Sequence, residues 1–434
     1  MTDASATQPR SLRPFLTLWV GQVFSLLGSQ LVQFSLIWWL TQQTGSATVL
    51  AVASIVGLVP QVVLGPFVGP LVDRWNRKRT MILADAAVAL ATLGLALLFW
   101  LGQAELWHVY AILFVRALGG TFHGPAITAS VSLMVPPEHL TRVQGLNQML
   151  NGGLNIISAP LGALLLQLLP LQGVLMIDLV TAAIAITTVL LVRVPQPQHA
   201  ETTTGSAVGQ YWQDLRAGFR YVLSWRGLLI LMGMAMLINL VLSPSMSFIP
   251  LLVTEHFEGT AWHLSAMEAA LGIGVLVGGV LLGAWGGFKS RVYTSLLGLI
   301  GLGLSVLLAG VVPSSLFALA VLAMGLMGLM SSLTNGPIMA VLQAAVAPSM
   351  QGRVFTLLSS AAMAMMPLGL AVAGPLADVM GVRAWFVVGG LLTLAMGVGG
   401  YFIPSLVNIE AQSKDHLEPV GAPDVARFSE SRSA

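Results

Sequence analysis

The sequence has few charged residues and no cysteine. Only 8% of its 434 residues are Asp, Glu, Lys or Arg, about a third of the ~25% typical of a soluble domain. Hydrophobic residues make up 56% of the chain, so a soluble protein of this length would lack the charge to cover its surface. The missing cysteines exclude disulfides and cysteine metal sites. Because the chain has so few charged residues, lipid must surround much of the protein.

Motifs for ATP hydrolysis and hydrolytic catalysis are also missing. The chain has no GxxxxGK[ST] phosphate loop, no HExxH and no Gly-x-Ser-x-Gly elbow. The polar N-terminus MTDASATQPRSLR lacks the pattern of a signal peptide, so the first apolar segment is expected to stay as a membrane span. We expect a protein that is not an enzyme, that binds no metal, cofactor or nucleic acid, and that is driven by an ion gradient.

Long apolar segments occur twelve times along the chain. Each has about the ~20 residues that a helix needs to cross a bilayer, and the alternation typical of a barrel strand is missing. The sequence predicts an all-α integral membrane protein with twelve transmembrane helices in two six-helix bundles. The predicted spans are residues 15–40, 48–72, 80–101, 107–134, 142–168, 172–193, 227–253, 264–287, 292–311, 315–346, 353–376 and 383–405.

A polar linker divides these spans six and six. The predicted units are an N-terminal tail at 1–12, an N-terminal bundle at 13–193, a linker at 194–226, a C-terminal bundle at 227–405 and a C-terminal tail at 406–434. Within the linker, apolar residues fall on one helical face at Trp212, Leu215, Phe219 and Val222. That pattern is typical of a short amphipathic helix in the membrane surface, or of one packed on the base of a bundle.

Basic residues lie mostly on one side of the predicted membrane. With the N-terminus in the cytoplasm, all but two of the 19 Lys and Arg residues fall on the cytoplasmic side; Arg383 lies outside and Arg116 lies within a span. Basic loops stay in the cytoplasm. We therefore predict a multi-pass protein of the cell (inner) membrane with both termini cytoplasmic.

The stretch GPLVDRWNRKR, residues 69–79, packs five charges into seven positions between apolar runs. It resembles the signature loop of the major facilitator superfamily, a Gly-x-Leu-x-Asp-Arg-x-Gly-Arg-Lys type of motif. Asn76 stands where the family usually has Gly, and Asn tolerates the left-handed conformation better than most residues. The resemblance implies a conformational latch between the bundles on the cytoplasmic side, formed by Gly69, Asp73, Arg74, Arg77 and Lys78. The alternative is that the basic residues only anchor the topology.

Four ionisable residues within predicted spans are candidates for proton coupling. Such residues cost roughly 2.5–3.5 kcal/mol each on insertion scales and usually face a cavity or a partner. Arg116 shares a helix face with His123, and LFVRALGGTFHGPA resembles the family's span-four signature, whose arginine has been tied to proton coupling. Asp178 is the expected partner of Arg116, and Glu268 is expected at a similar depth. A static packing pair is the alternative for Asp178, and a satisfied polar group is the alternative for His123.

Two further carboxylates are given structural interpretations. Asp85 is expected to support the basic loop, and Asp378 is expected to be an exposed loop residue. Uncharged polar residues at helical spacing indicate a face toward a cavity or another helix. The candidates for the substrate cavity are Gln22, Ser25, Ser29, Gln33, Asn147, Asn151, Asn155, Asn239 and Asn335. Methionines are frequent beside them and indicate an adaptable apolar lining, although ordinary helix packing also uses them.

Two segments resemble one branch of this superfamily in particular. Residues 21–51 and 272–291 look most like the macrolide-efflux branch of the drug exporters, which also resembles exporters of catechol siderophores. The resemblance implies a secondary active transporter that exports amphipathic compounds by alternating access, in exchange for protons, and we expect it to act as a monomer. Many relatives carry an acidic residue after the first-span glycine, where this chain has Ser29. The alternatives are an exporter of one dedicated metabolite, and a nutrient importer or a membrane sensor.

Overall fold

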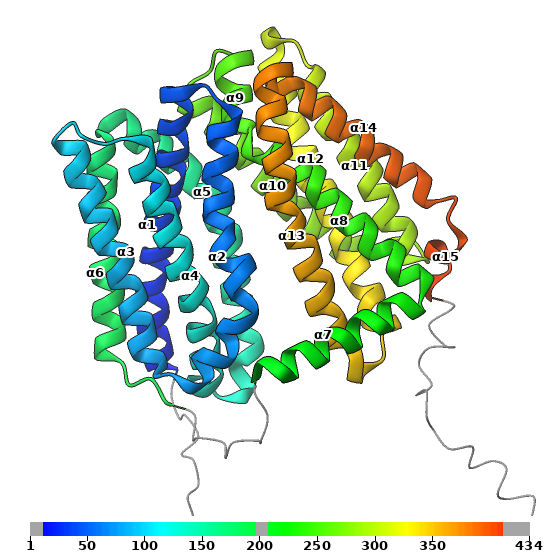
Figure 1. The fold of residues 1–434 in the computed structure, drawn as a ribbon, viewed down its shortest axis with the longest axis horizontal. Coiled ribbons are helices and arrows are strands. Elements are labelled where there is room, and N and C mark those ends of the chain that lie inside the picture. Colours follow the sequence, from blue (N-terminus) through cyan, green and yellow to red (C-terminus); the bar gives the residue numbers. More distant parts are fainter. Residues whose placement is uncertain (1–11, 197–206, 411–434) are drawn as a thin grey trace, which may run out of the picture.

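The computed structural model describes residues 12–196 and 207–410, and almost all of them are helical (Figure 1). Six long helices form each half of the molecule. Those of the N-terminal half are α1 (Arg13–Thr44), α2 (Ala47–Arg74), α3 (Arg77–Trp100), α4 (Leu106–Met134), α5 (Leu140–Leu168) and α6 (Leu171–Leu191). Those of the C-terminal half are α8 (Arg226–Ser247), α10 (Ala261–Trp285), α11 (Arg291–Val311), α12 (Phe317–Ala345), α13 (Pro348–Met380) and α14 (Val382–Gly400).

Eleven of the described helices are long and apolar enough to cross a membrane. The twelfth long helix, α4, has 29 residues and packs between α2 and α3 in the same bundle. It contains Arg116 and His123, which lower its hydropathy. The predicted architecture of two six-helix bundles is therefore confirmed. Short helical turns lie between or after the long helices at Pro137–His139, α9 (Ile249–Leu251), Leu252–His256, Ser314–Leu316 and α15 (Pro404–Val407).

Glycines allow the helices of the C-terminal half to approach closely. A Cβ at Gly274 or Gly278 of α10 would overlap the backbone of α12, and a Cβ at Gly328 of α12 would overlap the backbone of α10. Small residues have this role in membrane bundles because van der Waals contact has to hold helices together in lipid. This half extends slightly past its last long helix, since Leu406 and Ile409 are buried in it.

The two halves contact each other mainly through α2 with α13 and α5 with α10. Near the α1–α2 turn, the Asp378 carboxylate of α13 accepts hydrogen bonds from the backbone N–H groups of Ala47 (2.6 Å) and Thr48 (3.1 Å). It also accepts one from the Ser46 hydroxyl at 3.0 Å. Trp262 Nε1 donates to Gln167 Oε1 at 3.2 Å, between α10 and α5. We call this end of the molecule the closed end; it lies at the top of Figure 1.

The role of Asp378 corrects the prediction of a loop residue. The first N–H groups of a helix have no partner within the helix, so a carboxylate there satisfies them and interacts with the helix dipole. Asp378 caps α2 in this way from the other half of the molecule. The residue is exposed, as predicted, but it lies in a helix and bridges the two halves.

The linker forms α7 (Ala207–Ser224), which lies across the end of the C-terminal half opposite the closed end (Figure 1). It packs against α13 and α8: a Cβ at Gly218 would lie 3.1 Å from the carbonyl oxygen of Arg353, and Val222 is fully buried. Phe219 stays 47% exposed. These contacts favour the packed helix among the two predicted alternatives. The side chain of Trp212 and most of both predicted tails lie outside the described residues.

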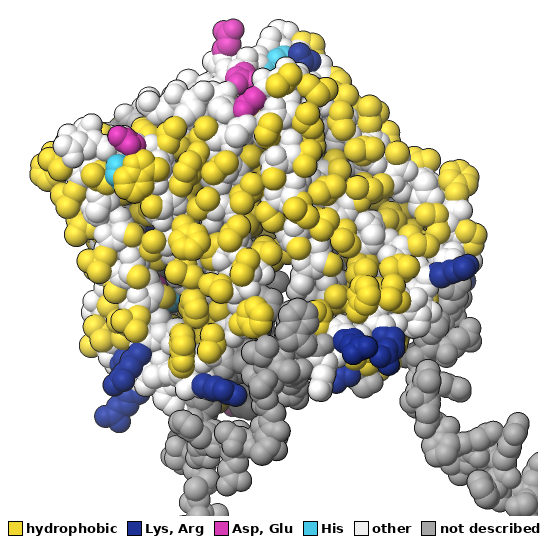
Figure 2. Space-filling view, viewed as in Figure 1, with side chains coloured by type: hydrophobic (Ala, Val, Ile, Leu, Met, Phe, Trp, Pro, Cys, Tyr) yellow, Lys and Arg dark blue, Asp and Glu magenta, His cyan; other side chains and the backbone are white. Residues whose placement is uncertain are grey.

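Charge is distributed unevenly over the surface (Figure 2). In that view Lys and Arg side chains gather at the end opposite the closed end, and most Asp and Glu side chains lie at the closed end. Hydrophobic side chains cover the band between them. Such a band flanked by charge is the surface expected of a protein that crosses a bilayer.

Candidate functional site

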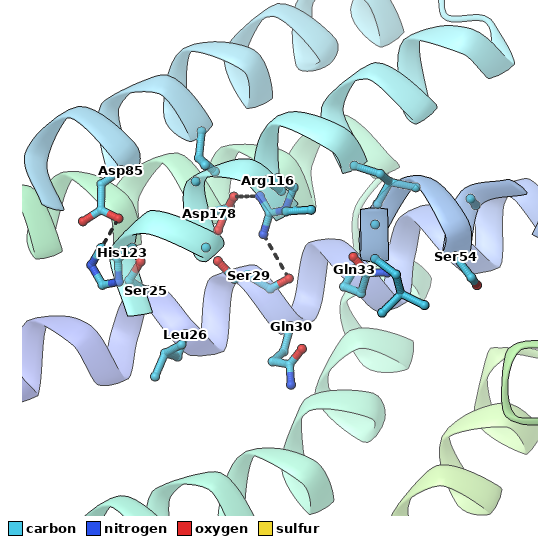
Figure 3. Close-up of a pocket in the computed structure, with 18 of the residues that line it drawn as sticks. Ser25, Leu26, Ser29, Gln30, Gln33, Ser54, Asp85, Arg116, His123 and Asp178 are labelled. Atoms are coloured by element: carbon cyan, nitrogen blue, oxygen red, sulfur yellow. Dashed lines mark hydrogen bonds and ion pairs between the residues drawn. The ribbon is translucent and has the colours of Figure 1, made fainter. Parts of the chain in front are cut away.

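A central cavity of about 610 Å³ lies between the two halves (Figure 3). Helix α1 contributes the polar stripe predicted from the sequence, and α8 and α13 contribute Met246 and Met366 from the opposite half. The predicted residues that line this cavity are Gln22, Ser25, Ser29, Gln33, Arg116, His123 and Asp178. Because residues 100 positions and more apart converge here, the cavity is the first candidate for a binding site.

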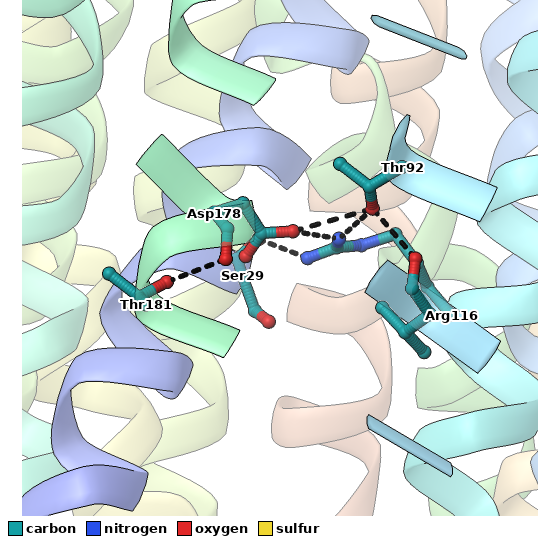
Figure 4. A network of polar contacts seen from close by, with 6 residues as sticks. Ser29, Thr92, Arg116, Asp178 and Thr181 are labelled. Atoms are coloured by element: carbon teal, nitrogen blue, oxygen red, sulfur yellow. Dashed lines mark hydrogen bonds and ion pairs between the residues drawn. The ribbon is translucent and has the colours of Figure 1, made fainter. Parts of the chain in front are cut away.

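Arg116 and Asp178 form a buried ion pair beside the cavity (Figure 4). The distance between Arg116 Nη1 and Asp178 Oδ2 is 2.6 Å, and the side chains are 10% and 4% exposed. The pairing that the sequence predicted is confirmed. Arg116 Nη2 also donates to the Ser29 carbonyl oxygen at 3.1 Å. The pair thus joins α4, α6 and α1.

Thr92 of α3 completes this network, and the sequence did not predict it. Its hydroxyl lies 3.4 Å from Arg116 Nη1 and 3.5 Å from Asp178 Oδ2, and it donates to the Val88 carbonyl at 2.9 Å. The only sequence signal is the spacing of Thr92 from Asp85, seven positions along one helix face. A hydroxyl that is both donor and acceptor fits beside either protonation state of the carboxyl group.

Glycine 28 explains how α6 comes so close to α1. A Cβ at Gly28 would lie 2.9 Å from Asp178 Oδ1 and would overlap Thr181. Thr181 itself donates to the Asp178 backbone carbonyl at 2.9 Å, which holds this turn of α6 (Figure 4). The absence of a side chain at position 28 therefore allows the carboxylate to be buried against α1.

His123 lies against Asp85 at the same cavity (Figure 3). The distance from His123 Nε2 to Asp85 Oδ1 is 3.5 Å, longer than a good hydrogen bond. Within the described part of the chain, His123 Nε2 and Asp85 Oδ2 have no hydrogen-bond partner. The prediction that Asp85 supports the basic loop is wrong, because its side chain lines the central cavity. Buried polar atoms without protein partners usually bind water, ions or ligand.

Glu268 lies in a separate chamber of about 160 Å³ between α1, α5 and α10, here called the side chamber. Asn155 also lines it, whereas Gln30 and Gln33 line both the side chamber and the central cavity. Glu268 therefore lies apart from Arg116 and Asp178, which line the central cavity. The sequence placed Glu268 at the same depth as Asp178, but the structure places Glu268 in a chamber lined by residues of α1 and α5.

A third cavity, of about 320 Å³, lies within the C-terminal half and is here called the C-terminal cavity. Asn239 and Asn335, which were predicted to line the substrate cavity, line this C-terminal cavity among leucine and methionine side chains. It shares Ser243, Met246 and Met366 with the central cavity. The lining is uncharged, so this cavity is suited to apolar groups.

The remaining candidates on α5 have other surroundings. Asn147 Oδ1 accepts a hydrogen bond from Trp19 Nε1 at 2.9 Å, so it joins α5 to α1. Asn151 is exposed and lines none of the three cavities described above.

Two methionines of α12 have a packing role. Met324 and Met327 are buried in the helix core, which is the ordinary packing role of methionine.

The charged hairpin between α2 and α3 packs on its own half. The buried Arg77 donates from Nη1 to the Ala129 carbonyl at 2.7 Å. Lys78 Nζ donates to the carbonyls of Leu190 (2.7 Å) and Val192 (2.9 Å), at the end of α6. Cations suit a helix C-terminus because its carbonyls lack partners. The side chain of Asp73 lies outside the described residues.

Asn76 does not adopt the left-handed conformation that its place in the motif suggested. Its φ is −70°, and its side chain accepts a hydrogen bond from the backbone N–H of Arg79 at 3.0 Å. Asn76 is therefore the N-cap of α3, a position at which Asn is strongly preferred. The Asn76 side chain therefore stabilises the start of α3.

Comparison with known proteins identifies the family. The model of the Major Facilitator Superfamily matches residues 18–370. The chain belongs to this superfamily. It is accordingly a multi-pass membrane transporter and not an enzyme, as the sequence predicted.

Two individual proteins are similar to this chain over most of its length. Macrolide efflux protein A of Streptococcus pyogenes is 34% identical over 384 residues, which span 88% of this chain and 94% of that protein. Multidrug efflux pump Tap of Mycolicibacterium fortuitum is 25% identical over 414 residues, or 92% of this chain and 98% of that protein. The chain thus falls in the macrolide-efflux branch of the superfamily, as its sequence indicated.

Solved structures support the fold alone. The nucleoside transporter NupG aligns with a TM-score of 0.63 and 15% identity, covering 87% of this chain and 97% of that one. A bacterial homologue of the human lysosomal transporter Spinster aligns with a TM-score of 0.64 and 14% identity, covering 95% and 99%.

Proposed function

We propose that this transporter exports lipophilic or amphipathic drugs, macrolides included, in exchange for protons. The observation that carries the proposal is the central cavity. The N-terminal half contributes a buried ion pair to its lining, and the C-terminal half contributes methionines. The similarity of the chain to macrolide efflux protein A and to the multidrug efflux pump Tap supports this substrate class. Flexible methionines adapt to apolar partners of different shape, as export of several drugs requires.

Proton exchange is assigned to the Arg116–Asp178 pair. A proton on Asp178 would cancel its attraction to Arg116 and weaken the contact between α4 and α6. Arg116 would then keep only its bonds to the Ser29 carbonyl and to Thr92. Because the pair joins three helices, its protonation changes how they pack. His123 and Asp85 form a second titratable pair in the same cavity.

The closed end is proposed to face outward and the basic end to face the cytoplasm. Support comes from the Lys and Arg side chains, which gather opposite the closed end (Figure 2). In this orientation both termini are cytoplasmic in the cell membrane, and the described state opens inward. Both halves of the cavity come from one chain, so a monomer provides a complete pathway.

In the opposite, outward-open state, the hairpin is proposed to latch the two halves on the cytoplasmic side. Its basic residues Arg77 and Lys78 are held by α4 and α6 in the present state. These contacts keep the hairpin in place on its own half, so that Asp73 can meet the facing half when the cytoplasmic ends approach.

Export and its energy source can be tested together. Cells that express the chain should survive higher concentrations of macrolides than cells without it, and a protonophore should remove the difference. Proteoliposomes should accumulate a macrolide when a pH gradient is imposed. Resistance that is equal with and without the chain would reject drug export and favour a dedicated metabolite. Uptake that does not depend on the pH gradient would reject proton exchange but would not reject drug export.

A further inference from the structure

The side chamber contains one ionisable residue, and that residue lacks a counter-charge. Its apolar lining is Phe34, Ile37, Leu154, Ala159 and Leu264; its polar lining is Gln30, Gln33, Asn155, Ser158 and Glu268. The carboxylates of the central cavity have basic neighbours: Arg116 beside Asp178 and His123 beside Asp85. Among the described residues, no Lys, Arg or His lies within ion-pair distance of Glu268. A carboxyl group in such a place either takes up a proton or, when it is ionised, is stabilised by a cation from outside the protein.

We propose that the side chamber binds the ammonium group of a lipophilic amine, with Glu268 as the counter-ion. This inference rests on the proposed export of drugs and names the substrate class as amines. The carboxylate supplies a charge-assisted hydrogen bond to the protonated amine. Phe34 supplies an aromatic surface, which attracts ammonium groups. The leucine and isoleucine side chains surround the alkyl substituents on the nitrogen.

The position of the chamber fits a head-group site. Its 160 Å³ is about a quarter of the 610 Å³ of the central cavity, so it admits part of an amphipathic drug rather than the whole. Gln30 and Gln33 line both spaces, so the two spaces adjoin. In the proposed site, the amine lies beside Glu268 and the apolar body lies in the central cavity.

The chamber also lies where the two halves meet. Glu268 belongs to α10, whereas Phe34 and Asn155 belong to α1 and α5 of the other half. Helix α10 comes close at Gly272, where a Cβ would lie 3.2 Å from the Asn155 carbonyl oxygen. A cation held there contacts both halves at once, so its binding and release depend on the conformational change.

A matched pair of ligands tests the proposal. The probes are erythromycin, a tertiary amine, and its neutral counterpart in which the dimethylamino group is an N-methylacetamide. Binding is measured on the full-length protein in lipid nanodiscs. The wild type should bind the amine at least about tenfold more tightly than the amide, and Glu268→Gln should reduce that preference to within about twofold while leaving binding of the amide intact.

Two variants complete the comparison. Glu268→Asp keeps the charge and should keep a preference for the amine. Glu258→Gln removes an exposed carboxylate outside the cavities and should match the wild type. A Glu268→Gln protein that keeps the amine preference, or that loses both ligands equally, would overturn the amine site. Failure of the wild type to bind or transport either ligand would instead reject the drug-export function itself.

A second measurement uses only the wild type, in case Glu268→Gln does not fold. A hydrophobic carbodiimide modifies carboxyl groups in apolar surroundings, and mass spectrometry locates the modified residue. Erythromycin should protect Glu268 from modification at least about fivefold better than the neutral amide. Equal protection by both compounds, or protection by neither, would contradict the site.

Discussion

The two halves of this transporter share an architecture but differ in their polar chemistry. Of the ionisable residues that line the central cavity, Asp85, Arg116, His123 and Asp178 all belong to the N-terminal half. The C-terminal cavity is lined by amides, hydroxyls, methionines and leucines. The difference fits the proposed function, in which the N-terminal half would exchange protons and the C-terminal half would accommodate the apolar body of the substrate.

Glu268 is the exception to this division. It belongs to the C-terminal half but faces helices of the N-terminal half across the side chamber. This residue belongs neither to the ionisable network of the N-terminal half nor to the apolar C-terminal cavity. Its place between them is the one from which a cationic substrate can link the two activities.

The largest effect is expected from breaking the charge pair of the N-terminal half. Arg116→Ala leaves Asp178 buried without its partner, which costs about 3–5 kcal/mol for a buried pair. Proton-driven macrolide transport in proteoliposomes should fall at least about a hundredfold, and thermal unfolding in detergent should shift to lower temperature.

A double variant separates stability from transport. Arg116→Met with Asp178→Leu removes both charges, which is often neutral for stability when a buried pair is replaced by apolar residues. It should restore thermal stability without restoring transport. Full transport by this double variant would show that the pair only packs the bundle.

The sequence predicted the long elements well because membrane spans are local. Twenty apolar residues in a row have few alternatives in lipid, so the expected spans and the described helices agree within a few residues at most ends. One difference is the seventh span, where a single helix was expected to residue 253. The helix ends at Ser247, and α9 and a wider turn at Leu252–His256 follow.

The candidate site was predictable only where burial demands a partner. Asp178 was assigned to Arg116 because a charge in a span needs a counter-charge at similar depth. Asp85 was misplaced because its distance from the basic loop was underestimated; it lies eight residues into α3, ~12 Å from the start of the helix. The partners of Asp378 include backbone N–H groups 331 and 330 positions away, and a backbone group has no sequence signature.

The next largest effect is expected at the charged hairpin between α2 and α3. A change there tests whether the N-terminal half also controls the conformation. Asp73→Asn should cut macrolide transport about tenfold, since a charge near a helix end is worth up to ~2 kcal/mol. Arg79→Gln is the control, because it removes an exposed charge of the same hairpin. Surface labelling should show normal insertion of both variants. Full transport by Asp73→Asn would remove the latch and leave the hairpin as a topology anchor.

A smaller effect is expected at the closed end, where the C-terminal half caps a helix of the N-terminal half. Asp378→Ala removes the carboxylate that α13 places at the start of α2, worth about 1 kcal/mol, and should raise the outward-open population about fivefold. Ser46 remains as the N-cap of α2. The chain has no cysteine, so Gln43→Cys and Met380→Cys can carry the only two spin labels. Distances between them should lengthen in Asp378→Ala and stay unchanged in the control Glu258→Gln. An unchanged distribution in Asp378→Ala would show that the apolar contacts alone close this end.

The smallest effect tests the apolar half of the comparison. Asn239→Leu removes an amide from the C-terminal cavity, and the Asn239 side chain donates only to the Ala235 carbonyl of its own helix, at 2.9 Å, among the described contacts. Losing one hydrogen bond to a ligand costs about 0.5–1.5 kcal/mol, so affinities for individual drugs should change by a few-fold and in different directions. The dependence of transport on the pH gradient should stay as in the wild type, because no charge of the N-terminal half is altered. A changed pH dependence would mean that proton exchange extends into the C-terminal half.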